Sequence, residues 1–507
     1  MSVNSVNYYK KKLILFLLLK SFLIIILMLF VGLGLGPDEA QYWTWSQKLD
    51  WGYYSKPPAI AWQIKLGTFL WGNTELGVRF FSIVIAFAQA LAIYHLALAC
   101  HLISRAAFWC ALVMAFCPIG IFGAFFAITD GGMLLCWTFA SLILVQAIKK
   151  STFPSVASLG FCILMGALFK WSIFILWLYI AVFYLYYYPL KSWYKSFLLA
   201  FCISLMGLLP SLWWNWSHDW ATFRHVMSST MQVGSGTSKG NFFEFVGSQA
   251  LLFSPIFFVL LLASYKVCLK KFKTLFQPIC FCFLLSFGSL VLFSTMALFQ
   301  KMQGNWIVFT YPTSIILVGW YCFEVNCKAF KWLKIGLIFT LFLSSLMFLW
   351  PVFSVNHRKS PFKHNLGWLN MREALKQTGY DPQKNFLVSD RYQTTSLLSF
   401  YSEGQKRAYF LNLEGHRKNQ FSYWPQFQKE EKEKTGYFVW VENAPHLETN
   451  WQNRQQFYQK ELLKYFEQVE TLDLMPLLQE KQQMVKGMLV FKCQNCKEIW
   501  PDEIQKY

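Results

Sequence analysis

The chain has 507 residues, of which 55% are hydrophobic and 14% are charged, and its formal net charge is +20. Soluble proteins carry about a quarter charged residues, so the composition excludes an ordinary soluble enzyme and indicates an integral membrane protein. A large positive charge can mark a nucleic-acid-binding protein. The basic residues are placed as membrane topology requires, however, and we expect no nucleic-acid partner.

Apolar runs recur from Leu13 to Phe353. Each is close to the ~20 residues that a helix needs to cross the hydrocarbon layer. The first run has no small-residue cleavage site, so it is expected to be a retained span and not a removed signal peptide. Eleven membrane-spanning helices are predicted, at residues 13–35, 76–99, 106–127, 131–148, 154–169, 171–188, 195–214, 246–265, 276–298, 306–323 and 333–353.

The basic residues are divided unevenly between the two sides of these spans. The N-terminus and the loops on its side hold fifteen basic residues against one acid, Glu324. The loops on the opposite side hold seven basic and seven acidic residues. Because cytoplasmic loops are enriched in Lys and Arg, the N-terminal side is predicted to be cytoplasmic. An odd number of spans then places the C-terminal tail outside the cytoplasm, together with the second set of loops.

The sequence divides into a membrane domain, residues 1–354, and a tail, residues 355–507, with the composition of a soluble domain. Short apolar runs and one helix-like stretch predict a small α/β domain that folds by itself. Cys493 and Cys496 form a lone C-x-x-C, for which unpaired thiols are favoured over a disulfide. The predicted strands are 385–388, 408–413, 437–441 and 487–491, and the predicted helix is 450–466.

The first external loop, residues 36–75, is rich in aromatic side chains. Such side chains favour the headgroup level of a bilayer, so the loop is predicted to lie along the membrane surface as an interfacial helix. Three of these aromatic residues, Tyr42, Trp43 and Tyr54, are also candidates for substrate contacts.

The acidic pair Asp38 and Glu39 stands where the first span emerges. Partial desolvation at the rim of the hydrocarbon layer is expected to raise the pKa values of these carboxylates. A carboxylate in such a place can serve as a general base. The alternative is an acidic pair that simply ends a helix in water.

Three further charged residues stand in external loops and are site candidates. Lys56 precedes Pro57 and Pro58, which stiffen the backbone and hold the ammonium in a direction suited to a phosphate. Lys170 lies in a tight turn between two spans, where it either contacts a phosphate or extends to the membrane surface. Asp130 is a lone acid before two glycines and is a catalytic candidate, unless it only caps a helix.

The second long external loop, residues 215–245, combines aromatic and polar side chains, as sugars and lipid headgroups require. Its substrate-binding candidates are His218, Asp219 and Arg224. His218 and Asp219 could also ligate a divalent metal, but a structural role is favoured because two adjacent ligands are weak support. Asn305, near Lys301, begins a later span on the same side and is a further substrate-binding candidate.

Several segments, in this order, resemble the polyprenyl-phosphate-dependent glycosyltransferases of the GT-C fold. The branch is the bacterial one akin to protein O-mannosyltransferases, lipopolysaccharide-core galacturonosyltransferases and lipid A aminoarabinose transferases. The segments are Pro37–Ser46, Trp51–Pro58, Thr129–Asp130, Phe169–Lys170, Trp214–Arg224, Gly304–Trp306, Asp390–Gln393 and Gly415–Gln420.

The resemblance implies an inverting sugar transfer at the outer, periplasmic face of a bacterial inner membrane, with Asp38 essential and Asp130 assisting. It implies that Lys56 contacts the carrier phosphate. Many relatives carry Asp-His before the two prolines, where this chain has Ser55 and Lys56. The missing acid puts a metal at that position in doubt, so a divalent metal is possible but no cofactor is certain.

We therefore expect a polyprenyl-phosphate-linked sugar donor, bound by Lys56 and Lys170, and Asp38 as the base for a lipid or protein acceptor, within surrounding membrane lipids. One alternative is a polytopic lipid or sugar transporter, or flippase, without transferase chemistry. A transport site should lie near mid-membrane, whereas these acids gather at one face. Another alternative, a non-catalytic envelope partner, leaves Asp38 and Lys56 without a role.

Overall fold

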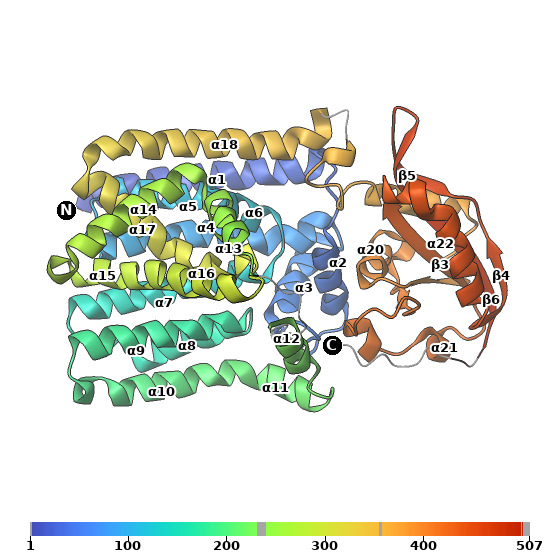
Figure 1. Cartoon of the computed structure of the whole chain (residues 1–507), viewed down its shortest axis with the longest axis horizontal. Helices are drawn as coiled ribbons and strands as arrows, with labels where there is room; N and C mark the ends of the chain where they lie inside the picture. Colours follow the sequence, from blue (N-terminus) through green and yellow to red (C-terminus); the bar gives the residue numbers. More distant parts are fainter. Residues whose placement is uncertain (1–2, 231–239, 354–356, 498, 500–507) are drawn as a thin grey trace.

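A computed structural model describes residues 3–230, 240–353, 357–497 and 499 of the chain. A bundle of helices is followed by a sheet-containing domain at one end of the bundle, and the N-terminus lies at the other end (Figure 1). The helices of the bundle are α1 (Val3–Phe30), α4 (Glu75–Ala99), α5 (Ser104–Phe116), α6 (Pro118–Phe125), α7 (Thr129–Lys149), α8 (Val156–Ala167), α9 (Ile175–Tyr187), α10 (Tyr194–Leu205), α11 (Leu209–Trp216), α13 (Phe242–Phe253), α14 (Pro255–Lys270), α15 (Gln277–Phe283), α16 (Ser289–Phe299), α17 (Tyr311–Trp320) and α18 (Phe330–Phe353).

The bundle confirms an integral membrane protein. Among the described residues, seven segments are long and apolar enough to cross a membrane, or up to nine if two bent helix pairs each count as one span. The pairs are α5 with α6, bent by 57°, and α13 with α14, bent by 107°. Pro118 and Pro255 begin the second helix of each pair, because proline suits a first turn but cannot continue a helix. Two shorter apolar helical stretches coincide with the remaining predicted runs, so eleven crossings stay a prediction.

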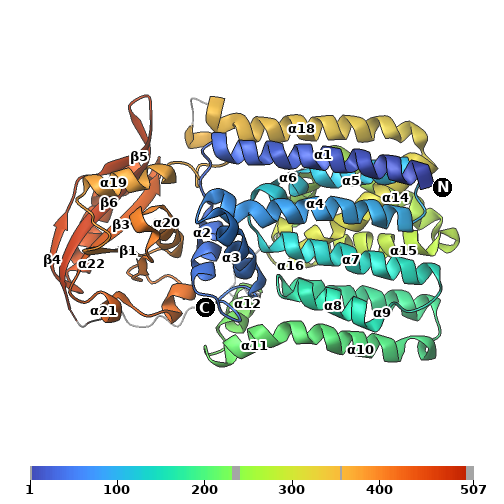
Figure 2. The same ribbon diagram turned by 180° about the vertical axis from the view of Figure 1, so that it is seen from behind.

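The first loop folds into α2 (Pro37–Gln47) and α3 (Ala59–Trp71), which lie across the end of the bundle beside the C-terminal domain (Figures 1 and 2). The aromatic side chains of α2, Tyr42, Trp43 and Trp45, are buried in the protein. Trp43 packs edge-on against Phe400, with ring centroids 5.0 Å apart, and Trp45 stacks on Tyr53 at 4.6 Å. The predicted helix thus exists with Trp43 and Trp45 packed against protein, while Trp51 of the same loop is exposed, so contact of the loop with headgroups stays a prediction.

The C-terminal domain contains the predicted mixed α/β fold. A six-stranded sheet has the order β2-β1-β3-β6-β4, with β5 paired to β6. β1 is parallel to β2 and to β3, whereas β6 is antiparallel to its neighbours. The elements are α19 (Met371–Gln377), β1 (Asn385–Ser389), α20 (Tyr392–Tyr401), β2 (Tyr409–Phe410), α21 (Phe427–Glu430), β3 (Thr435–Asn443), α22 (His446–Leu462), β4 (Phe466–Thr471), β5 (Met475–Glu480) and β6 (Gln483–Cys496). Cys493 and Cys496 are free thiols.

Alternation along the strands gives the sheet two apolar faces. Phe438 and Phe491 belong to a core with α22, while Val439 and Val490 belong to a core with α20. The second core continues into α2, including Trp43, so the tail shares its interior with the first external loop. Independent folding of the tail stays a prediction, and the predicted boundary at residue 355 lies outside the described residues.

Candidate active site

A cavity of about 580 Å³ lies where the bundle, the α2–α3 loop and the C-terminal domain meet. Five basic side chains and two carboxylates line it, so its surface is electropositive. The lining residues are Asp38, Gln41, Tyr42, Tyr54, Ser55, Lys56, Ile128, Thr129, Asp130, Lys170, His225, Lys301, Gln303, Asn305, Trp306, Tyr392, Arg417, Lys418 and Asn419.

Asp38 is placed in the cavity by the start of α2. Gly36 precedes the helix and Pro37 begins it, so the Asp38 carboxylate stands in the first turn. The side chain is open to the cavity, but protein surrounds the cavity, and this burial raises the pKa of Asp38. The charge of Lys56 opposes the rise without cancelling it. A carboxylate with a raised pKa is a better proton acceptor than an ordinary aspartate.

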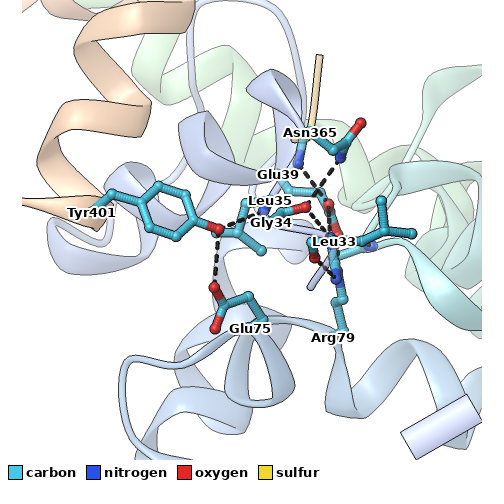
Figure 3. A network of polar contacts seen from close by, with 10 residues as sticks. Leu33, Gly34, Leu35, Glu39, Glu75, Arg79, Asn365 and Tyr401 are labelled. Atoms are coloured by element: carbon cyan, nitrogen blue, oxygen red, sulfur yellow. Dashed lines mark hydrogen bonds and ion pairs between the residues drawn. The ribbon is translucent and has the colours of Figure 1, made fainter. Parts of the chain in front are cut away.

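Glu39 lies on another side of α2 and does not line the cavity. Its carboxylate receives two hydrogen bonds from the buried guanidinium of Arg79, at 2.9 and 2.7 Å. The backbone amides of Gly36 and Ala127 donate two more, each at 2.9 Å. Figure 3 shows this network, in which Arg79 also donates to the carbonyls of Leu33 and Gly34. Glu39 therefore anchors the helix start, and we remove it from the catalytic candidates.

The two predicted phosphate ligands, Lys56 and Lys170, both line the cavity. Burial lowers the pKa of Lys56, and the neighbouring Lys170 lowers it further. Lys170 donates a 2.7 Å hydrogen bond to Asp130, so this predicted catalytic acid is held in an ion pair. A side chain at Gly132 would collide with the Phe169 ring, 2.5 Å from where its Cβ would stand. Glycine there lets the starting turn of α7 approach the turn that carries Lys170.

Several cavity residues were missed as site candidates from the sequence, among them His225, Tyr392 and Arg417. Arg417 Nη1 donates to the imidazole of His225, 3.1 Å from Nδ1. Burial lowers the pKa of His225 to about 4, with smaller effects from Arg417 and Lys56, so this histidine is neutral at neutral pH. His225 also lies against Tyr54, with ring centroids 4.9 Å apart. Tyr392 and Arg417 lie in the two tail segments that resemble the family, and this resemblance could have marked them as site candidates.

The substrate-binding candidates divide into two groups. Tyr42, Tyr54 and Asn305 line the cavity. Trp43 does not, because it is buried under the C-terminal domain and its indole donates to Asn73 at 3.0 Å. Its predicted contact with substrate is therefore withdrawn.

The candidates of the second loop lie outside the cavity lining. His218 stacks on Trp214 with ring centroids 4.1 Å apart and bonds the Trp214 carbonyl through Nδ1 at 2.8 Å. Asp219 and Arg224 are exposed, and Asp219 has a φ of 52°. The loop also forms the helix α12 (Ala221–Thr230), and His225 of this helix lines the cavity. Residues 231–239 of the loop lie outside the described chain.

A divalent metal does not fit the cavity as the described residues form it. Ser55 offers no carboxylate beside Lys56, and His218 and Asp219 lie elsewhere. Asp130 is paired with Lys170, and Asp38, Asp130 and His225 do not converge as a group of three ligands. Within the described ranges, the one group of three converging His, Cys, Asp or Glu side chains lies in the C-terminal domain, outside the cavity lining. Lysine and arginine side chains supply the positive charge of the cavity.

Residues 55–214 match the family model described as dolichyl-phosphate-mannose-protein mannosyltransferase. Lipid A galacturonosyltransferase RgtD from Rhizobium johnstonii is 27% identical over 311 residues, which are 61% of this chain and 63% of RgtD. The match thus spans less than two thirds of that relative's length.

Two solved structures have a similar architecture. ArnT from Cupriavidus metallidurans, bound to undecaprenyl phosphate, superimposes with a TM-score of 0.62 and 13% identity, over 94% of this chain and 98% of ArnT. The oligosaccharyltransferase of Archaeoglobus fulgidus in its apo form gives a TM-score of 0.51 and 11% identity, over 90% of this chain and 71% of that enzyme. The chain has the GT-C fold. The resemblance to GT-C glycosyltransferases that the sequence motifs indicated is thereby confirmed.

Proposed function

We propose that this protein is an inverting glycosyltransferase that moves a sugar from a polyprenyl-phosphate carrier to an envelope acceptor at the periplasmic face of the bacterial inner membrane. One observation carries the proposal. In a GT-C fold, a carboxylate with a raised pKa, Asp38, shares a cavity at the end of the membrane bundle with a surplus of basic side chains.

The basic side chains suit the phosphate of a lipid-linked donor. Lys56 and Lys170 come from the membrane domain and Arg417 from the C-terminal domain, so a phosphate between them would receive charge-assisted hydrogen bonds from two sides. Such bonds stabilise the negative charge that builds up on the leaving phosphate. ArnT, which shares the fold, has been solved with undecaprenyl phosphate bound, and a carrier of this class is the donor lipid we propose.

Asp38 would act on the acceptor. The acceptor hydroxyl oxygen attacks the anomeric carbon while its proton passes to the Asp38 carboxylate. The bond from the anomeric carbon to the phosphate oxygen breaks, its electron pair stays on the polyprenyl phosphate, and the anomeric configuration is inverted. If the acceptor nucleophile is an ionised phosphate, no proton is removed and Asp38 orients the acceptor instead.

The acceptor that we favour is lipid A. RgtD is named as a lipid A galacturonosyltransferase, and the basic residues beyond those needed for one donor phosphate, such as Lys301 and Lys418, suit a second anionic group. Lipopolysaccharide core and protein remain the other acceptors to be tested. A lipid transporter is disfavoured because the charged cavity lies at one end of the bundle and not at its middle.

The proposal is tested with purified protein, an undecaprenyl-phosphate-linked uronic acid or pentose, and lipid A, with products identified by mass spectrometry. We expect one glycosyl unit added to lipid A and an equal amount of undecaprenyl phosphate released, whereas nucleotide sugars give no product. The protein would be a transporter instead if it transferred sugar to none of the three acceptors, lipid A, lipopolysaccharide core and protein, and moved the carrier across the membrane of reconstituted vesicles.

A further inference from the structure

A second group of polar side chains converges in the C-terminal domain, apart from the cavity. Asp390 follows β1, while Glu414 and His416 lie in the segment after β2. One oxygen of each carboxylate and one ring nitrogen of the histidine lie within 4.8 Å of one another. The three side chains therefore come together from two separate segments of the chain.

The carboxylate of Asp390 is buried and only partly hydrogen-bonded. Its side chain is completely buried, with 0% exposure. Its Oδ2 accepts a 2.6 Å hydrogen bond from the Tyr458 hydroxyl, but its Oδ1 has no hydrogen-bond partner among the described residues. A buried carboxylate oxygen without a partner is costly, and a cation at this point would remove that cost.

Glu414 and His416 complete the group beside Asp390. Glu414 Oε1 accepts hydrogen bonds from Tyr458, at 2.7 Å, and from Arg454, whereas its Oε2 lies 3.3 Å from Nε2 of His416. Between them, Gly415 has a φ of 69°, the left-handed conformation that favours glycine. The His416 side chain is 40% exposed, although its Nε2 is buried, so the imidazole ring lies between the group and water and its rotation would admit an ion.

We propose that Asp390, Glu414 and His416 form a binding site for a divalent metal ion, with Zn²⁺ as the best-suited ion. Zn²⁺ accepts imidazole nitrogen together with carboxylate oxygen at about 2.0–2.2 Å and commonly completes its shell with water. Ca²⁺ and Mg²⁺ prefer sites built from oxygen alone. The ligand atoms are close enough for small side-chain rotations to enclose one ion.

The site would act as a structural clamp behind the cavity. Tyr392 stands two residues after Asp390, and Arg417 directly follows His416, and both line the cavity. A metal that joined the two segments would fix the positions of these cavity residues without touching substrate. The site itself is inferred independently of the proposed glycosyl transfer.

Isothermal titration of the detergent-purified full chain, first stripped with a chelator, tests the site. We expect one Zn²⁺ per chain and affinity weakened at least about tenfold in Asp390→Asn and in His416→Gln. His446→Gln is the matched control, because His446 is exposed at the start of α22 and outside the group; its affinity should equal that of wild type. Equal affinity in all four proteins, or no Zn²⁺ binding by wild type, overturns the proposal.

A second measurement needs no variant and covers the case in which a substitution prevents folding. Zn²⁺ should protect His416 of the wild-type chain from modification by diethyl pyrocarbonate, mapped by mass spectrometry, and should leave His446 reactive. Co²⁺ added to the stripped protein should give visible absorption bands that Zn²⁺ abolishes. Unchanged modification of His416 with and without Zn²⁺ would contradict the site.

Discussion

Lys56 is held in the cavity by the two prolines that follow it, and its predicted role depends on charge. Lys56→Met should weaken use of the lipid donor by about 1.5 to 3 kcal/mol, or roughly ten- to a hundredfold, because a charge-assisted contact is lost. Lys56→Arg keeps the charge and should lose much less. Steady-state kinetics over a range of donor concentrations measures both. Lys65→Met, at an exposed position of α3 outside the cavity, is the control, and equal kinetics for Lys56→Met and Lys65→Met would exclude Lys56 from the site.

His225 predicts a pH effect on stability. The pKa of His225 falls to about 4 in the folded protein, against about 6.5 in an unfolded chain. The unfolded state therefore binds a proton first as the pH falls from about 6.5 towards 4, and the folded state loses stability over that window. In His225→Gln this contribution is absent. The melting temperature of wild type should exceed that of His225→Gln by less at pH 5 than at pH 7.5. A difference that does not change with pH would contradict a lowered pKa of His225.

Single residues show how far the sequence can predict a site. Asp38 and Lys170 were found because a charge at the edge of a span is costly, Lys56 because two prolines follow it, and Asp130 because it is a lone acid before two glycines. Glu39 was included with its neighbour Asp38, but successive helix residues point about 100° apart. Asp38 therefore faces the cavity, whereas Glu39 faces Arg79. The role of Glu39 depends on its contact with Arg79, which is distant in the sequence, and a local sequence pattern cannot predict such a contact.

At the level of elements, α2 is fixed by the network of Figure 3. Tyr401 of α20 donates to Glu75 at 3.0 Å, and the Leu35 amide donates to Tyr401 at 2.6 Å. The network thus joins the end of the first span, α4 and the C-terminal domain. The start of α2, and Asp38 with it, depends on contacts from three parts of the chain.

Removing one partner of the buried Glu39–Arg79 pair should be strongly destabilising, by about 3–5 kcal/mol, since the other charge is left buried alone. Thermal unfolding of Arg79→Met, Glu39→Gln and the double variant measures this. We expect the double variant to lose clearly less than the sum of the two single losses. Additive losses would show that the two side chains do not stabilise the fold as a pair.

Elements with a strong apolar pattern were predicted well, and so was α22, but several others were missed. Long apolar runs marked the bundle, and the buried strands β1, β3 and β6 stood out in the tail. β4 and β5 were missed because exposed and half-buried polar residues interrupt them. α20 was missed because its buried face is rich in Ser and Thr, which carry little apolar signal.

At the scale of the whole molecule, the C-terminal domain lies at the end of the bundle opposite the N-terminus (Figure 1). The cavity lies at the same end, because residues of that domain line it. The positive-inside distribution predicts that this end is periplasmic. A cysteine at exposed Asp219 should react with an impermeant maleimide in spheroplasts, and one at exposed Lys271 should react only after lysis. The parent chain should have the exposed Cys202 and Cys327 replaced by Ser. The reverse labelling pattern would show that the cavity end of the bundle is cytoplasmic and would contradict the predicted topology.

The central claim, that the cavity catalyses glycosyl transfer with Asp38 as its base, is tested most directly by Asp38→Asn. Asparagine keeps the shape of the side chain but cannot take the acceptor proton, so turnover should fall by about 10²- to 10⁴-fold while the polyprenyl-phosphate sugar still binds. Asp219→Asn, at an exposed position outside the cavity, should transfer sugar at the wild-type rate. Turnover of Asp38→Asn within about threefold of wild type, far below the loss expected for a general base, would contradict the account.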